Sequence, residues 1–155
     1  MAETGLAARQ ADPPFAAAFS FSVGGVKLGR FTEVSGLAVT MAVEEIVEGG
    51  NNESAVKLPG PLSWPNLVLK RGLTSDDAML KWILGYSGDG FGSSGHTAEK
   101  KLATLTLYDS RGQPTRLWNI RDAMPVRWTG PQFAADGGAL ATEELEVCHG
   151  GFTVE

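Results

Sequence analysis

The sequence predicts a mainly β fold, a β-sandwich or barrel of about seven or eight strands with one flanking α-helix and an extended hairpin arm. Three observations support this prediction. Apolar and polar residues alternate along most of the chain with the period of half-buried strands. The 20 Gly and 8 Pro among the 155 residues divide the chain into short segments separated by turns. Apolar residues recur at helical spacing in only one stretch, near residues 74–84.

The length of the chain fits one domain whose core is large enough to fold without disulfides or metals. Residues 1–16 are mostly small and polar and include Pro13-Pro14, so we expect a flexible N-terminal segment. A single β domain should follow over residues 17–155. The N-terminal segment could be idle or could clasp a neighbouring molecule, and the sequence leaves both open.

Composition excludes several classes of function. The formal charge is -5 and no basic block is present, so no direct nucleic-acid recognition is expected. A lone cysteine, Cys148, cannot form an intramolecular disulfide, which favours the reducing cytoplasm. The N-terminus lacks the pattern of a signal peptide, and no apolar run approaches the roughly 18 residues of a membrane span. We therefore expect cytoplasmic assembly without a signal peptide and no membrane insertion by this chain.

The first predicted element is a hairpin over residues 19–31. Apolar alternation on both sides of Gly24-Gly25 is typical of a two-residue turn, in which glycines supply the positive φ angles. The expected register places Val23 opposite Val26 and Phe21 opposite Leu28, with their apolar side chains on one face.

A turn over residues 32–36 should lead into a longer strand from Leu37 to Val43, followed by the hairpin arm. The apolar pattern changes phase at residues 45–48, which predicts a bulge or a strand that leaves the core. Residues 49–54 form a flexible tip and residues 55–58 can pair back. The arm is either a solvated loop or a surface that docks on another subunit. The candidate interface residues are Val43, Ile46, Val47, Gly49, Gly50, Asn51, Asn52, Val56 and Leu58.

Residues 56–84 combine a short strand, a turn and the one helix. We expect a strand at Leu67–Leu69, a turn at Arg71-Gly72, and a helix of about ten residues that begins at Thr74 as N-cap with Asp77 completing a capping box. Gly85 supplies the C-terminal stop. The expected core and helix anchors are Trp64, Leu67, Leu69, Leu80, Trp82 and Ile83.

A glycine-rich loop follows the helix. Its Gly90, Gly92 and Gly95 match the spacing of a dinucleotide fingerprint, but the loop follows a helix and leads into polar residues, which is the wrong context. We therefore expect a flexible loop. A small-ligand-binding β-barrel, or an enzyme that uses the loop at residues 85–95, remains an alternative function of another class.

The second half of the chain reads as strands. Expected strands cover residues 102–108, 117–120, 124–128 and 140–148, with a turn at residues 109–114. In the last long strand, Leu145 and Val147 should point inward and Glu144 and Glu146 outward.

The chain carries no recognisable catalytic, cofactor or metal constellation. The histidines are His96 and His149, and His149 follows Cys148 in a predicted strand, where neighbours point to opposite faces. We therefore expect no enzyme, no cofactor and no metal. Two groups of carboxylates, Glu44-Glu45-Glu48 and Glu143-Glu144-Glu146, are typical of a solvated face of strands. If many copies of the chain lined a pore, the same carboxylates would form an acidic wall. The lumen-facing candidates on that hypothesis are Glu44, Glu48, Glu144 and Glu146.

Three stretches of the sequence together resemble the phage tail tube protein family typified by the phage T4 tail tube subunit. They are FSVGG-VKLGRFTEVSGL, VKLPGPLSWPNLVLKRGLTSDDAMLKWI and EELEVCHGGF, and the resemblance spans about Phe19 to Phe152. It is strongest to the version found in extracellular contractile injection systems. The resemblance implies a structural subunit that forms hexameric rings, which stack into an inner tube acting as a conduit for cargo and as a piston on sheath contraction.

The implied partners are further copies of the chain, a contractile sheath protein, baseplate or spike proteins, tube-terminator proteins and effector cargo in the lumen. The implied location is a phage tail-like particle, for which cell lysis is one route of release. The hairpin arm occupies the position that reaches neighbouring subunits and rings in such families. Within the same resemblance, a tube-initiator or baseplate-adaptor paralogue is the alternative.

Overall fold

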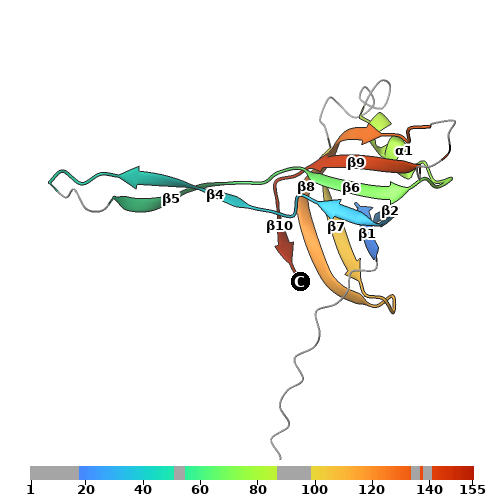
Figure 1. Ribbon diagram of the computed structural model, residues 1–155, viewed down its shortest axis with the longest axis horizontal. Coiled ribbons are helices and arrows are strands. Elements are labelled where there is room, and N and C mark those ends of the chain that lie inside the picture. Colours follow the sequence, from blue (N-terminus) through green and yellow to red (C-terminus); the bar gives the residue numbers. More distant parts are fainter. Residues whose placement is uncertain (1–17, 51–54, 87–98, 134–136, 138–140) are drawn as a thin grey trace, which may run out of the picture.

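The computed structural model describes residues 18–50, 55–86, 99–133, 137 and 141–155, and over them it is mainly β with one short helix (Figure 1). This architecture confirms the predicted fold class. The helix α1 covers Ala78–Leu84. The strands are β1 Ala18–Val23, β2 Val26–Phe31, β3 Glu33–Ser35, β4 Thr40–Ile46, β5 Val56–Ser63, β6 Leu67–Gly72, β7 Lys101–Tyr108, β8 Pro114–Thr129, β9 Thr142–Cys148 and β10 Gly151–Val154.

One curled antiparallel sheet forms the body of the molecule. Its hydrogen-bonded order is β2-β1-β7-β8-β9-β6-β3, with β10 paired to the side of β8. The two ends of this path, β2 and β3, are consecutive in the chain, and the backbone N–H of Thr32 between them donates to the Lys70 carbonyl at 2.9 Å. The sheet therefore wraps around its core without a closed ladder.

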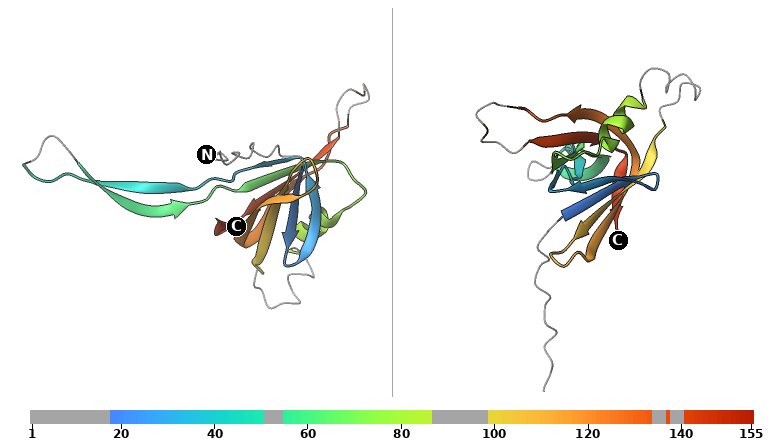
Figure 2. Two further views of the ribbon diagram at one scale, coloured as in Figure 1. Left: turned by 90° about the horizontal axis from the view of Figure 1, so that it is seen from below. Right: turned by 90° about the vertical axis from the view of Figure 1, so that its right-hand side faces the viewer.

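The hairpin arm, defined here as the β4–β5 pair over residues 40–63, is a separate two-stranded sheet. It extends away from the body along the long axis of the molecule, on the side opposite to α1 (Figures 1 and 2). The chain thus has a compact body that carries one long projection. Within the part of the chain that the structure describes, the helix content includes no candidate membrane span.

The core lies inside the curled sheet and under α1. It is built from alternate residues of β1, β6, β7 and β9, because successive strand side chains point to opposite faces. Met79 is the fully buried residue of α1, and the Trp82 ring lies 6.3 Å from that of Phe21. The buried apolar residues are Phe21, Val23, Leu28, Phe31, Leu67, Leu69, Met79, Ala103, Leu105, Ile120, Ala123, Leu145 and Val147.

The β1–β2 hairpin forms as predicted, but its register differs after the first pair. Val23 pairs with Val26 as expected, whereas Phe21 pairs with Gly29 because Leu28 is an extra residue at a bulge. The bulge turns Leu28 into the core, and Val26 stays 64% exposed. The expectation that Phe21 faces Leu28 was therefore wrong, whereas Val26 lies opposite Val23 as expected but at the open edge of that face.

The change of phase at residues 45–48 predicted either a bulge or a strand that leaves the core, and the structure shows the second. The ladder of the arm does shift, but between Met41 and Val43, and pairing is regular from Val43 to Ile46. At the change of phase, the apolar side chains move from one face of the strand to the other. The strand itself continues to Ile46. The strand begins at Thr40, and the predicted turn at residues 32–36 contains β3.

Strand lengths were underestimated at two places. The predicted turn at Arg71-Gly72 is the end of β6, and the two strands predicted over residues 117–128 are one strand, β8. Asp122, with a φ of 54°, lies inside β8 and lets the strand turn from its partner β7 to its partner β9. The chain therefore uses a bent strand where its polar residues predicted a break.

The helix begins three residues later than predicted. Its N-cap is Asp77, without a side-chain capping bond, and the predicted capping box from Thr74 does not form. Thr74 Oγ1 accepts a hydrogen bond from the Asp76 N–H, and Asp76 Oδ1 accepts one from the Ala78 N–H. These side chains stabilise turns before the helix, which is the competing role of such residues.

Candidate functional site

The hairpin arm is the candidate functional site because its strands expose an unusual number of large apolar side chains. Every residue of β4 is exposed, and so is every residue of β5 except Gly60. A two-stranded hairpin is marginally stable in water by itself, and exposed apolar surface of this kind marks an interaction site. The arm therefore has the character of a surface that another molecule covers.

The register of the arm separates its two faces. The pairs Glu44–Leu58 and Ile46–Val56 share one face, and the pairs Val43–Pro59 and Glu45–Lys57 share the other. The Lys57 and Glu45 side chains form an exposed ion pair of 3.8 Å on the second face. The first face, defined here as the apolar arm face of Glu44, Ile46, Val56 and Leu58, carries a single carboxylate among aliphatic side chains.

The structure places the predicted interface residues as follows. The exposed fraction is 57% for Val43, 48% for Ile46, 76% for Val47, 44% for Val56 and 40% for Leu58. Gly49 and Gly50 follow β4 at the tip, where Gly50 has a φ of 98°. Asn51 and Asn52 lie outside the described residues.

Sequence reasoning missed part of this surface. Met41 and Leu62 are also about half exposed on the arm, at 51% and 50%, and so is Val39 directly before it, at 49%. The alternation from Leu37 to Val43 predicted a strand of the core, whereas β4 belongs to the arm. Alternation alone cannot distinguish a face covered by its own core from one covered by another molecule. The usable signal was the combination of Pro59, Gly60 and Pro61, which suits an isolated edge better than a central strand.

An aromatic cluster joins the arm to the body. The rings of Trp64, directly after β5, and of Phe152 in β10 meet edge to face at 5.0 Å. His149 Nδ1 accepts from the Gly151 N–H at 3.1 Å, so its Nε2–H donates to the Pro65 carbonyl at 3.0 Å. These contacts fix the root of the arm to the C-terminal strand.

The other predicted anchors lie in the body. Leu67 and Leu69 of β6 are fully buried, Leu80 and Ile83 of α1 are half-buried, and Trp82 packs against the core from its half-buried position. Trp64 is half-buried at the arm root. The residue of α1 that is fully buried is Met79.

The lumen-facing candidates fall into two separate groups. Glu44 lies in the arm and Glu48 near its tip, whereas Glu144 and Glu146 are on β9 in the body. The Glu144 carboxylate lies 3.7 Å from Lys70 Nζ, and that of Glu146 lies 2.8 Å from the Arg127 guanidinium. The Asn66 amide donates to Glu146 at 2.9 Å, and this hydrogen bond, assisted by Arg127, lowers the pKa of Glu146 from its ordinary value near 4.5.

Sequence reasoning also grouped Glu143 with the solvated carboxylates, and this was wrong. Glu143 is 5% exposed and lies beside Arg71, with Arg71 Nε and Glu143 Oε2 separated by 3.3 Å. Glu143 is in phase with Leu145 and Val147, so its strand position turns it inward.

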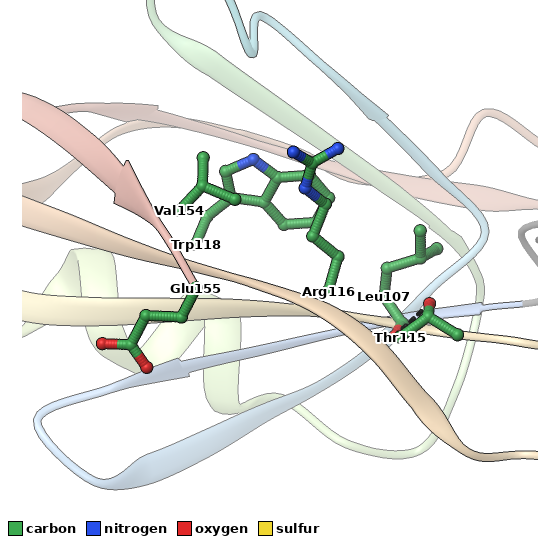
Figure 3. A pocket seen from close by; sticks show the side chains of 6 residues that line it. All are labelled: Leu107, Thr115, Arg116, Trp118, Val154 and Glu155. Carbon is green, nitrogen blue, oxygen red and sulfur yellow. Dashed lines mark hydrogen bonds between the residues drawn. The ribbon is translucent and has the colours of Figure 1, made fainter.

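The body carries an open hollow of about 660 Å³ at the end of β7, β8 and β10 (Figure 3). Arg116 lies over the Trp118 ring at 5.8 Å from its centroid, and the Thr115 hydroxyl donates to the Leu107 carbonyl. The Glu155 side chain points away from Arg116 and Thr115 (Figure 3).

Among the described residues, no group of three or more His, Cys, Asp or Glu side chains is arranged to hold a metal ion. The glycine loop of the alternative reading lies mostly outside the described residues, as does His96.

Comparison with a family model gives a match over nearly the whole folded chain. Residues 16–153 match the model of the T4-like virus tail tube protein gp19. No curated protein sequence matches the chain.

Comparison with solved structures finds similar folds in chains of contractile injection systems. The chain is 25% identical to a chain of the cryo-EM structure of the anti-feeding prophage cap, the tube-terminating cap, with a TM-score of 0.78 over 100% of this chain and 99% of that one. It is 25% identical to a chain of the PVC sheath–tube complex of an extracellular contractile injection system in the extended state, with a TM-score of 0.77 and the same coverage. A chain of the PVC sheath/tube terminator structure is 27% identical, with a TM-score of 0.73 over 92% of this chain and 96% of that one.

Proposed function

The chain belongs to the T4-like virus tail tube protein family, and from this premise we propose that it is an inner-tube subunit of a contractile injection system. Its copies close into hexameric rings, and the rings stack into a hollow tube. The tube is a conduit for cargo and a piston when the surrounding sheath contracts. The subunit is a structural protein and does no chemistry.

The exposed apolar hairpin arm carries this proposal. An arm whose strands are exposed along their whole length is stable only if another surface covers it. A heterologous contact, in which one surface binds a different surface on the next copy, forms rings if it closes and filaments if it does not. Repeating such a contact at every subunit makes a stiff tube from individually modest contacts.

The partners proposed for this role are a sheath protein on the outside, baseplate or spike proteins and a tube terminator at the ends, and cargo inside. Assembly takes place in the cytoplasm, and the product is a phage tail-like particle. The carboxylates Glu44, Glu48, Glu144 and Glu146 remain candidates for the lumen surface. They lie on two different parts of the molecule, Glu44 and Glu48 in the arm and Glu144 and Glu146 in the body.

A tube initiator or adaptor is the second candidate. The chain is as similar to a chain of the tube-terminating cap structure as to a chain of the sheath–tube complex, at 25% identity in each case. A subunit at a tube end must form rings but need not stack on itself.

Negative-stain electron microscopy of the full-length protein, paired with its mass from light scattering, tests the proposal. Sixfold rings that stack into hollow tubes are expected. Rings that do not stack would favour the initiator. A monomer that also fails to assemble on a baseplate ring would contradict both functions and return attention to ligand binding, which would then be tested by substitution of Gly90 and Gly92.

A further inference from the structure

A second apolar surface lies at the end of the molecule opposite to the hairpin arm. It is a pocket of about 330 Å³ between α1, the β1–β2 hairpin and the start of β7. We call it the helix pocket; the residues that line it are Val23, Val26, Leu28, Ala78, Lys81, Trp82 and Lys101. Its wall is aliphatic and aromatic, and its two charged members are both lysines.

The lysines of the helix pocket are available to a new partner. Lys81 pairs with Asp77 at 3.0 Å and Lys101 with Glu99 at 3.5 Å, but the four side chains are 41% to 77% exposed. Exposed ion pairs contribute little to stability, so an incoming carboxylate can compete for these ammonium groups. The pocket is therefore suited to an aliphatic surface that carries a carboxylate.

The apolar arm face has this chemistry. Ile46, Val56 and Leu58 supply aliphatic side chains that are 40% to 48% exposed, and Glu44 lies directly opposite Leu58 in the ladder. The apolar arm face carries no lysine or arginine, because Lys57 points to the other face. Polarity and charge sign thus agree between the two surfaces.

The arm of a molecule cannot reach its own helix pocket, because the arm and α1 project in opposite directions along the long axis (Figures 1 and 2). A neighbouring copy must supply the arm. We propose that the apolar arm face of one copy seats in the helix pocket of a neighbouring copy. The contact is heterologous, so each copy offers one arm and one pocket and the contact repeats along an assembly. This inference rests on the proposed function, in which copies of the chain assemble.

Disulfide trapping tests the contact directly in assembled protein. In a Cys148→Ser background, the pair Ile46→Cys and Ala78→Cys places one thiol on the apolar arm face and the other in the helix pocket. Mild oxidation should give a ladder of covalent dimers and higher multimers, because a disulfide forms only between Cα atoms within about 7 Å. The matched control, Glu45→Cys with Ala78→Cys, uses the opposite face of the same arm and should give no ladder.

Charge reversal provides the second test. Replacing Lys81 and Lys101 by Glu should raise the concentration needed for assembly roughly tenfold, and adding Glu44→Lys should restore much of it. Lys27→Glu with Arg111→Glu changes the net charge equally at exposed positions outside the pocket and should have little effect.

The outcomes separate this inference from the proposed function. The Cys148→Ser protein with the trapping pair could assemble and still run as a monomer on a denaturing gel after oxidation. That result would overturn the inference while leaving the tube role intact. So would equal ladders from both faces of the arm, or no rescue by Glu44→Lys. If the unsubstituted protein forms no assembly, the proposed function itself fails.

Discussion

Arg71 and Glu143 form a buried ion pair between adjacent strands of the body. The two residues are register partners on β6 and β9, Arg71 Nε lies 3.3 Å from Glu143 Oε2, and their side chains are 4% and 6% exposed. Arg71 also donates to the carbonyl oxygens of Leu28 and Asp76, at 3.1 and 2.9 Å. One guanidinium therefore connects β2, β6, β9 and the segment that precedes α1.

We predict that Arg71→Met lowers the free energy of unfolding by about 3–5 kcal/mol, because it leaves the Glu143 carboxylate buried and unpaired. Arg71→Met with Glu143→Leu should cost clearly less than the sum of the single changes, since neither charge then remains. Urea unfolding below the concentration of assembly measures both. Additive losses would show that the pair is not coupled.

Gly29→Ala should destabilise the protein through the same guanidinium. Gly29 has a φ of 137°, and a Cβ there would lie 2.2 Å from Arg71 Nη1. Gly25→Ala is the matched control, since Gly25 has a φ of 81° but an added Cβ meets nothing within 4 Å. Both changes strain the backbone, and only the first displaces Arg71. Gly29→Ala should therefore lower the urea midpoint more; equal midpoints would contradict this explanation.

Stability at acid pH should depend on Glu146. Its pKa is lowered in the folded state from the ordinary value near 4.5, mainly by the hydrogen bond from Asn66. A lowered folded-state pKa gives stability that is present above the unfolded-state pKa and is lost as the pH falls through the folded-state value. Glu146→Gln and Asn66→Ala should each flatten the fall in unfolding free energy below about pH 4.5. An unchanged pH profile in both variants would refute the assignment.

Much of the body could be predicted because its strands bury one face each. Leu145 and Val147 are fully buried while Glu144 and Glu146 reach polar partners at the surface, as the alternation in β9 indicates. The Gly24-Gly25 turn likewise predicted the first hairpin, since both glycines have positive φ. These features are local, so the sequence contains the information needed for them.

The parts that could not be predicted depend on contacts between distant segments. Arg71 continues the inward phase of Leu67 and Leu69, but an Arg-Gly dipeptide reads as a turn unless its partner Glu143, on another strand, is known. The delayed start of α1 has a related cause, because Arg71 holds the Asp76 carbonyl before the helix begins. The arm was recognised from its change of phase, yet the exposure of Met41 and Leu62 follows only from its separation from the body.

The arm itself gives the prediction that separates folding from assembly. Ile46→Asp with Val47→Asp should abolish rings and tubes, because both side chains are exposed in the single chain and the change places two charges on a surface that assembly must desolvate. The unfolding free energy of the monomer should change by less than about 0.5 kcal/mol, since neither residue belongs to the core. Electron microscopy and urea unfolding measure the two effects.

Leu67→Asp is the contrasting variant, because Leu67 is fully buried and its loss should unfold the body. Intact tubes from the arm variant would refute an assembly role for Ile46 and Val47, and a loss of monomer stability would assign them to the fold.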